Sequence, residues 1–121
     1  MRAVIDSDIL IDFLQGSPDA KTEILRYDEA CFSIISWIEV MSGAKTPAAK
    51  QAAEILFTNL RRVDLASEIA HKAVSIRQST RMKLPDAIIL ATADTLGCIV
   101  VTRNAKDFPP ADPRVRIPYQ L

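Results

Sequence analysis

The sequence predicts an α/β fold in which helices cover both faces of a mainly parallel sheet. Short apolar runs typical of strands alternate along the chain with stretches whose apolar residues recur at helical spacing. This alternation is typical of parallel strands joined by crossover helices. The 121 residues suffice for one domain with a real core and are too few for two. We therefore expect a single domain over residues 1–121.

The first stretch, residues 3–14, has the pattern of a strand, an acidic turn and a helix. Residues 3–5 form an apolar run that ends on Asp6. Apolar side chains then recur at one-, three- and four-residue steps over residues 9–14, as on one face of a helix. Ser7 and Asp8 stand between the two patterns, and both are residue types that cap helix N-termini. Asp6 is thereby placed at the carboxyl end of the first predicted strand.

Two cap-and-proline pairs, Ser17-Pro18 and Thr46-Pro47, predict helix starts in the first half of the chain. The helix from Pro18 is expected to end at about residue 27. A buried strand over 30–35 and a short helix over 36–43 follow. The helix after Pro47 is alanine-rich, and a short strand is expected over 62–65. On that helix the expected buried residues are Ala52, Ile55, Leu56 and Leu60.

The second half continues the alternation. A long helix is expected over 66–82, and another begins at Pro85-Asp86 and ends at Gly97. Residues 99–102 form a strongly apolar strand followed by a polar turn over 103–107. A last short strand is expected over 115–117. The inward residues of the two helices are predicted to be Ile69, Ala73, Ile76, Ile88, Ile89, Thr92 and Leu96.

Composition excludes several classes of protein. Fifteen basic and fifteen acidic residues give a net charge of zero, which does not indicate nonspecific nucleic-acid binding. The charge is uneven, however, with five basic and nine acidic residues in 1–60 and ten and six in 61–121. His71 is the only histidine, which excludes a site built on several histidines. Cys31 and Cys98 lack metal-ligand spacing and are expected to be free thiols.

The chain is expected to be cytoplasmic. No apolar run approaches the roughly 20 residues of a membrane span. Charged residues at positions 2, 6, 8 and 12 interrupt any signal-peptide pattern. We therefore expect no membrane association.

Four acidic residues follow predicted strands or begin a predicted helix. Asp6 follows the first strand, Glu39 follows the second by a few residues, Asp86 lies in the first turn of a helix, and Asp107 follows the strand that ends at Thr102. A parallel sheet brings such positions to one edge. Crowded carboxylates repel one another unless a cation joins them, and oxygen-only ligands suit Mg²⁺ or Mn²⁺. Such an ion activates water for phosphodiester hydrolysis.

Each acid also has a structural interpretation. Asp86 gains about 0.3–1 kcal/mol from the helix dipole alone. Ser36-x-x-Glu39 has the spacing of a capping box, Asp8 is an N-cap type, and Asp107 suits a turn. Asp6 has no obvious structural task. Composition and spacing alone leave the metal site and these structural roles both open.

Four segments together resemble the PIN-domain family, and most closely the VapC-type ribonuclease toxins of prokaryotic toxin–antitoxin pairs. They are VIDSDILIDFL at the start, SWIEVMSG, LPDAIILATA and VVTRNAKDF near the end. Their order and spacing match the family over almost the whole chain. The resemblance implies a three-layer α/β/α fold with four or five mainly parallel strands. It also implies a Mg²⁺-dependent endoribonuclease (with Mn²⁺ as the alternative ion), commonly a homodimer, inhibited by a small cognate antitoxin.

The resemblance assigns the site residue by residue. The family's acidic quartet falls on Asp6, Glu39, Asp86 and Asp107, and its hydroxyl near the fourth acid falls on Thr102. Two departures concern supporting positions. Asp8 stands where the family most often has Asn. Asn104 stands where some relatives carry the fourth acid.

Five cations near the elements of Asp86 and Asp107 are candidate RNA phosphate contacts, with a solvated surface as the structural alternative. They are Arg77, Arg81, Lys83, Arg103 and Lys106.

Three other functions stay open from the sequence. Asp6-x-Asp8 after a strand mimics the nucleophile motif of haloacid-dehalogenase-type phosphatases, although Leu10 and the short chain argue against it. A receiver-type signalling domain would use an aspartate such as Asp64, but it requires a lysine that nothing after residues 115–117 supplies. A non-catalytic PIN-like binding module is the third, and the intact acidic set argues against it.

Overall fold

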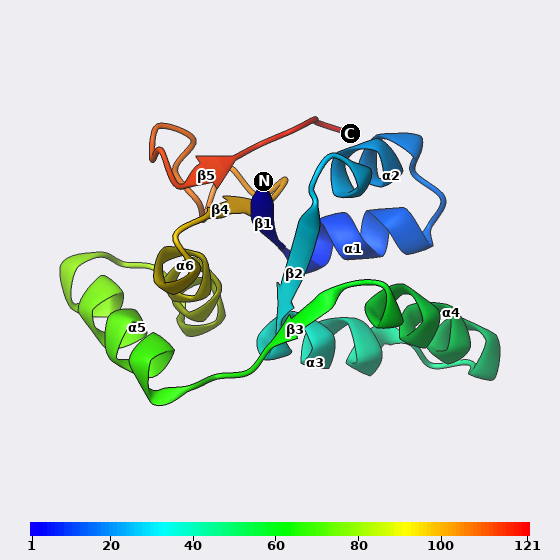
Figure 1. Cartoon of the computed structure of the whole chain (residues 1–121), viewed down its shortest axis with the longest axis horizontal. Helices are drawn as coiled ribbons and strands as arrows, with labels where there is room; N and C mark the ends of the chain where they lie inside the picture. Colours follow the sequence, from blue (N-terminus) through cyan, green and yellow to red (C-terminus); the bar gives the residue numbers. More distant parts are fainter.

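The computed structural model describes residues 1–121. Its centre is a five-stranded sheet in the order β3-β2-β1-β4-β5, in which every neighbouring pair is parallel (Figure 1). Six helices flank the sheet, which confirms the predicted fold class. The strands are β1 (Arg2–Ile5), β2 (Glu29–Ser33), β3 (Arg61–Val63), β4 (Ile99–Val101) and β5 (Val115–Arg116).

The helices begin largely where the caps predicted. They are α1 (Ser7–Leu14), α2 (Pro18–Leu25), α3 (Ile34–Gly43), α4 (Pro47–Thr58), α5 (Ser67–Ser79) and α6 (Leu84–Leu96). The Ser17 side chain accepts a hydrogen bond from the Ala20 backbone N–H, and the Thr46 side chain accepts one from the Ala49 N–H. Each side chain therefore caps the helix that follows it, α2 or α4. Gly97 ends α6 with a φ of 67°, a left-handed conformation that favours glycine.

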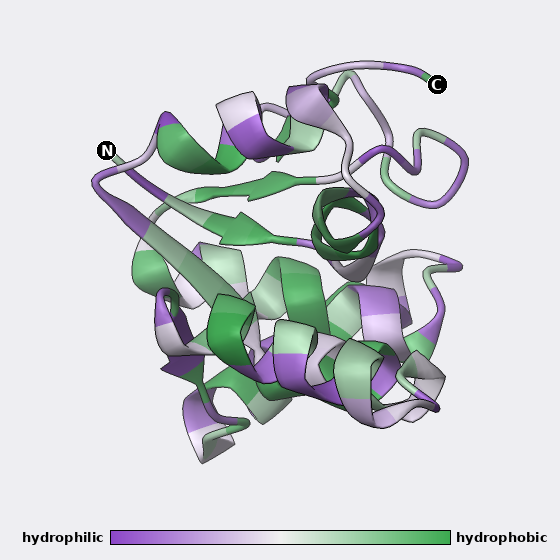
Figure 2. Ribbon diagram, turned by 90° about the vertical axis from the view of Figure 1, so that its right-hand side faces the viewer, coloured by the Kyte–Doolittle hydropathy of each residue, from purple (hydrophilic) through white to green (hydrophobic).

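The two faces of the sheet follow from the alternation of side chains along β1. Ala3 and Ile5 pack into a core with α1, α2, α3 and α4, whereas Val4 faces α6 on the other side. Helix α5 packs mainly on α6 and extends that layer outward (Figure 1). In Figure 2 the strands inside the molecule are mostly apolar, in keeping with their place between the helix layers. The result is the predicted three-layer arrangement.

Three helices differ from the prediction, and one of them, α5, ends at Ser79 rather than at residue 82. Helix α3 begins at Ile34 rather than Ser36, because the Ser33 hydroxyl accepts from the Ile35 N–H at 3.1 Å and caps it two residues earlier. Helix α4 buries Ala53, Leu56 and Phe57, whereas Ile55 is 58% exposed and Ala52 is exposed. The Phe57 ring packs against Phe32 of β2 at a tilt of 47°, with centroids 4.5 Å apart. This contact turns the buried face of α4 by one residue.

The general character of the chain agrees with its composition. Cys31 and Cys98 are both free, as expected. None of the helices combines the length and the apolarity that crossing a membrane requires.

The strand order creates a switch point between β1 and β4. The chain builds β2 and β3 on one side of β1, then crosses over to add β4 and β5 on the other. Open α/β sheets bind ligands outside the carboxyl ends of the strands at such a reversal. The order also excludes the receiver-type alternative, whose sheet follows 2-1-3-4-5. Asp6 and Thr102, which directly follow β1 and β4, stand at this point.

Candidate metal centre

Asp6 links the two strands at the switch point. Its N–H donates to the Val101 carbonyl at 2.9 Å, so it continues the pairing of β1 with β4. One carboxylate oxygen accepts from the Ser7 N–H at 2.7 Å, and the other accepts from the Thr102 hydroxyl at 2.8 Å. Asp6 therefore caps α1 itself, a role that the sequence had suggested for Ser7 or Asp8.

The environment of Asp6 opposes its ionisation. The side chain is only 6% exposed, and burial is the largest cause that raises its pKa, followed by the negative charge of Asp8. The hydrogen bonds from Thr102 and Ser7 lower the pKa but do not compensate, and Asp86 adds a further negative charge. The pKa of Asp6 is raised from 3.8 to about 7. A nearby cation would favour its charged form.

Asp8 holds the loop that follows β4. Its Oδ2 accepts from the Arg103 N–H at 3.1 Å and lies 3.3 Å from the Thr102 hydroxyl. Burial raises the pKa of Asp8, although these hydrogen bonds oppose the rise. Asp8 lies inside the first turn of α1, so the prediction that it is the N-cap was wrong. Instead, its hydrogen bond with the Arg103 N–H joins α1 to the loop that begins at Thr102.

Glu39 reaches the site from the interior of α3. Its Oε1 accepts from the Ser7 hydroxyl at 2.7 Å, and the same hydroxyl lies 3.2 Å from that of Ser36. Ser36 is buried within α3, not at its N-cap, so the capping-box interpretation of Glu39 was wrong. Ser7 is the supporting residue that the sequence did not reveal. Its only signal was its place directly after Asp6.

Asp86 lies in the first turn of α6, and the crossover places that end of the helix near the carboxyl edge of the sheet. Burial is the largest cause that raises the pKa of Asp86, followed by the charges of Asp107 and Glu39. The positive charge of Lys83 opposes this rise. Acids from α1, α3, α6 and the loop after β4 therefore share one electrostatic field.

Asp107 is held by its own loop. The Asn104 side-chain amide donates to Asp107 Oδ2 at 2.8 Å, and the Lys83 ammonium lies 3.7 Å away. The hydrogen bond from Asn104 lowers the pKa of Asp107, and the charges of Lys83 and Lys106 act in the same direction. Asn104 thus supports Asp107 as a hydrogen-bond donor.

The donor set suits a hard divalent cation. No three of the His, Cys, Asp and Glu side chains form a ready-made ligand group. Hydrogen bonds from Ser7, Thr102 and Asn104 hold Glu39, Asp6 and Asp107 in their present positions. The oxygens are nevertheless all carboxylate. Burial raises the pKa of Asp6, Asp8 and Asp86, and neighbouring acids raise those of Asp6 and Asp86 further. Mg²⁺ and Mn²⁺ prefer such ligands.

The predicted phosphate contacts separate into two groups. The Arg103 guanidinium is engaged by Asp12, at 2.8 and 3.0 Å, and the Tyr119 hydroxyl donates to the same carboxylate. Arg77 borders a mainly apolar hollow between α5 and α6. In contrast, a groove of about 450 Å³ beside Asp107 is lined by Arg81, Lys83 and Lys106. Arg114, which the sequence did not single out, joins them.

Comparison with known proteins agrees with this architecture. The family model for the PIN domain matches residues 3–111. A solved toxin–antitoxin complex from Klebsiella pneumoniae contains a chain that is 38% identical, with a TM-score of 0.91, covering 98% of this chain and 99% of that one. A search of curated proteins gives no match.

More distant structures share the fold. VapBC2 from Rickettsia felis, bound to a DNA fragment from its promoter, contains a chain 17% identical with a TM-score of 0.84, covering 96% of this chain and 98% of that one. FitAcB from Neisseria gonorrhoeae gives 19% identity and a TM-score of 0.78, with 98% and 99% covered.

Proposed function

The chain belongs to the PIN-domain family, and from this premise we propose that it is a metal-dependent endoribonuclease that hydrolyses RNA phosphodiester bonds. The family is generally one of nucleases, and family membership removes the phosphatase and receiver alternatives. The observation that carries the proposal is the buried Asp6 carboxylate, whose pKa is raised to about 7 at the switch point of the sheet. An ionised group there needs a cation as its partner.

The carboxylates have distinct roles in this proposal. Asp6 and Asp86 are the principal ligands of Mg²⁺, or of Mn²⁺ in its place, and Glu39 and Asp107 complete the site directly or through water. The ion, when bound, supplies Lewis-acid activation of water and neutralises charge on the phosphate.

Three donors keep these carboxylates in place. Thr102 orients Asp6, Ser7 orients Glu39 and Asn104 orients Asp107 through the hydrogen bonds that the structure contains. Asp8 fixes the loop on which Thr102 and Asp107 stand.

Cleavage of RNA by the purified protein tests the proposal. We expect cleavage with Mg²⁺ or Mn²⁺ that stops in EDTA. Asp6→Asn and Asp86→Asn should each lose at least about 100-fold in rate, because changes even in the groups around metal ligands cost 10–100-fold. Asp19→Asn, at an exposed position in the first turn of α2, is the matched control and should cleave like the wild type.

Undiminished cleavage by folded Asp6→Asn or Asp86→Asn would refute the assignment of the site. Absence of cleavage with any divalent ion would favour the non-catalytic binding module.

We further propose that the protein is the toxin of a toxin–antitoxin pair, acts in the cytoplasm and forms a homodimer. Support for the toxin role comes from the chain that is 38% identical within a solved toxin–antitoxin complex. The partner would be a small antitoxin that covers the acidic edge of the sheet, with a cationic side chain suited to its negative charge. Sedimentation of the purified protein tests the dimer.

Expression of the chain alone tests the toxin role. It should slow growth of the host, and Asp86→Asn should relieve the effect. Harmless expression of an enzyme that cleaves RNA in vitro would contradict the toxin role and leave the nuclease intact.

A further inference from the structure

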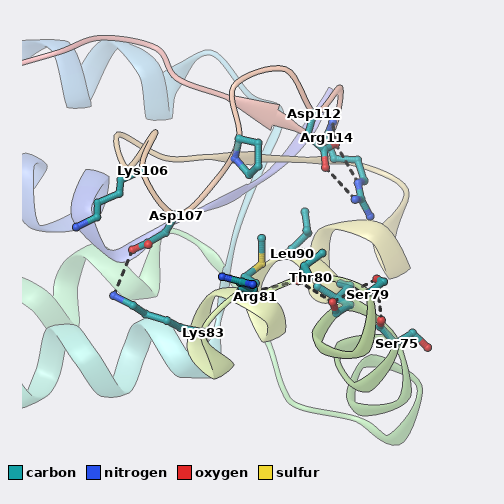
Figure 3. Close-up of a pocket in the computed structure, with 13 residues that line it drawn as sticks. Ser75, Ser79, Thr80, Arg81, Lys83, Leu90, Lys106, Asp107, Asp112 and Arg114 are labelled. Atoms are coloured by element: carbon teal, nitrogen blue, oxygen red, sulfur yellow. Dashed lines mark hydrogen bonds and ion pairs between the residues drawn. The ribbon is translucent and has the colours of Figure 1, made fainter.

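We propose that the groove beside Asp107 binds the sugar–phosphate backbone of single-stranded RNA next to the bond that is cut. This proposal rests on the proposed ribonuclease function and gives it a substrate path. The groove, called here the phosphate groove, lies between the α5–α6 region and the loop that connects β4 to β5 (Figure 3).

The phosphate groove begins at the candidate metal centre. Asp107 lines the groove and also acts electrostatically on Asp86, so the two sites share a wall. Arg81 and Lys83 lie on the α5–α6 connection, and Lys106 and Arg114 lie on the loop between β4 and β5 (Figure 3). A strand whose phosphate lies at the carboxylates would therefore pass beside residues of this groove.

The charges in the groove favour an anion. Its lining carries four cations and two carboxylates, a local excess of two positive charges in a chain whose net charge is zero. Arg114 is paired with Asp112 at 2.9 Å, and Lys83 lies 3.7 Å from Asp107. Neither Arg81 nor Lys106 forms an ion pair with a carboxylate. These two side chains are free to bind phosphate oxygens.

The remaining lining explains why the contact is to the backbone. The hydroxyls of Ser75, Ser79 and Thr80 already donate to carbonyls of α5, so they are not available as donors to phosphate. Ile76, Met82 and Leu90 provide an apolar surface for a ribose or a base. Cations with no neutral donors beside them position a strand without reading its sequence. The groove's volume of about 450 Å³ lies in the range of ligand-binding clefts.

The test measures RNA binding apart from cleavage. Anisotropy of a labelled 12-nucleotide single-stranded RNA is followed in Mg²⁺ at several salt concentrations, with Asp86→Asn as the cleavage-deficient parent. Adding Arg81→Ala and Lys106→Ala should weaken binding at least about tenfold and reduce the slope of log affinity against log salt by about 1.4, since each phosphate contact on a single strand contributes about 0.7.

Two further variants are matched controls. Lys45→Ala with Lys50→Ala removes two exposed cations near the start of α4 and should leave affinity and slope unchanged. Arg81→Lys with Lys106→Arg keeps the charges and should retain binding. All the replaced side chains are exposed, so melting curves should show folded proteins.

The outcomes separate the two proposals. If the parent binds RNA and the Arg81→Ala, Lys106→Ala variant keeps its affinity and salt slope, the groove assignment is wrong and the nuclease stands. If the Lys45→Ala, Lys50→Ala control loses as much RNA affinity, the groove assignment is also wrong. Binding would then depend on surface cations in general and not on those of the groove. If the wild type neither binds nor cleaves RNA, the proposed function fails and the groove with it.

Discussion

Asp6 combines an observed structural role with the chemical role that we propose for it. Its hydrogen bonds cap α1 and hold Thr102, which explains why a carboxylate is accommodated at the end of a buried strand. Burial and the charge of Asp8 nevertheless raise its pKa to about 7. The native state therefore binds a proton at Asp6 more tightly than the unfolded chain does, and this gives a measurable pH dependence.

Without metal, the contribution of Asp6 to stability should fall as pH rises from about 4 to about 7, because the native state then has to ionise a buried group. Asp6→Asn removes this titration and keeps a residue that caps helices well. Between about pH 5 and pH 8 in EDTA, the free energy of unfolding of the wild type should drop relative to Asp6→Asn by about 2 kcal/mol. Urea unfolding measures this difference. Parallel pH curves for the two proteins would show that Asp6 ionises freely.

Glu39 provides a second test at a single residue. Gln can accept the hydrogen bond from Ser7 but brings no negative charge, so Glu39→Gln should keep its melting temperature and lose most metal-dependent cleavage. Glu54→Gln, exposed on α4, is the control. Ser7→Ala should reduce cleavage less than Glu39→Gln, because Ser7→Ala removes a hydrogen bond to Glu39 but keeps its negative charge. A wild-type cleavage rate in Glu39→Gln would confine the site to Asp6, Asp86 and Asp107.

The sequence was informative about single acids and less so about their partners: the resemblance marked Thr102 and Asn104 as supporting positions, but not Ser7. Asp6, Glu39, Asp86 and Asp107 stand out because each follows a strand or begins a helix. The partners Ser7 and Asn104 are ordinary polar residues whose contacts depend on where α3 and the loop after β4 lie. Ser33 and Ser36 are both plausible caps in sequence, and only the end of β2 selects Ser33.

At the scale of elements, the loop after β4 depends on an ion pair with α1. Arg103 contacts Asp12 through two hydrogen bonds, and Tyr119 near the C-terminus adds a third. Burial alone would raise the pKa of Asp12, but these hydrogen bonds and the charge of Arg103 lower it below its usual value. The pair therefore fixes the start of the loop that carries Asp107.

Arg103→Met should destabilise the protein by about 2 kcal/mol, because Asp12 is left buried without its charge partner and Arg103 itself is partly exposed. Chemical unfolding measures this loss, and Asp12→Asn added to Arg103→Met should recover part of it. The alternative, that Arg103 contacts RNA, makes the opposite prediction. Stability would then be unchanged and only the salt dependence of RNA binding would fall.

Element boundaries were predictable where a cap and a proline coincide, as at Ser17-Pro18 and Thr46-Pro47. They were not predictable where several residues satisfy the same pattern. The alanine-rich sequence of α4 allows more than one apolar face, and the contact of Phe57 with Phe32, on another element, decides between them. Tertiary packing therefore decides which face of α4 is buried, because the spacing of its apolar residues allows more than one.

At the scale of the whole molecule, strand order turns separate motifs into one site. The sequence indicates parallel strands and crossover helices but not the side of β1 on which β4 is added. The observed order places the ends of β1 and β4 together, with α3 and α6 delivering Glu39 and Asp86 to the same edge. The fold places the unevenly distributed charges on adjoining surfaces, because the acidic edge of the sheet lies beside the basic phosphate groove.

Calorimetric titration of the protein with Mn²⁺, in buffers of different ionisation enthalpy, tests most directly whether this edge is a metal site. Metal requires the ionised carboxylate, so binding should release protons. With the pKa of Asp6 near 7, release should be close to one proton per ion at about pH 6 and near zero at about pH 8.5. Asp6→Asn should bind Mn²⁺ far more weakly and without this release, while Asp19→Asn should match the wild type. Wild-type binding and proton release in Asp6→Asn, or no Mn²⁺ binding by the wild type, would contradict the account.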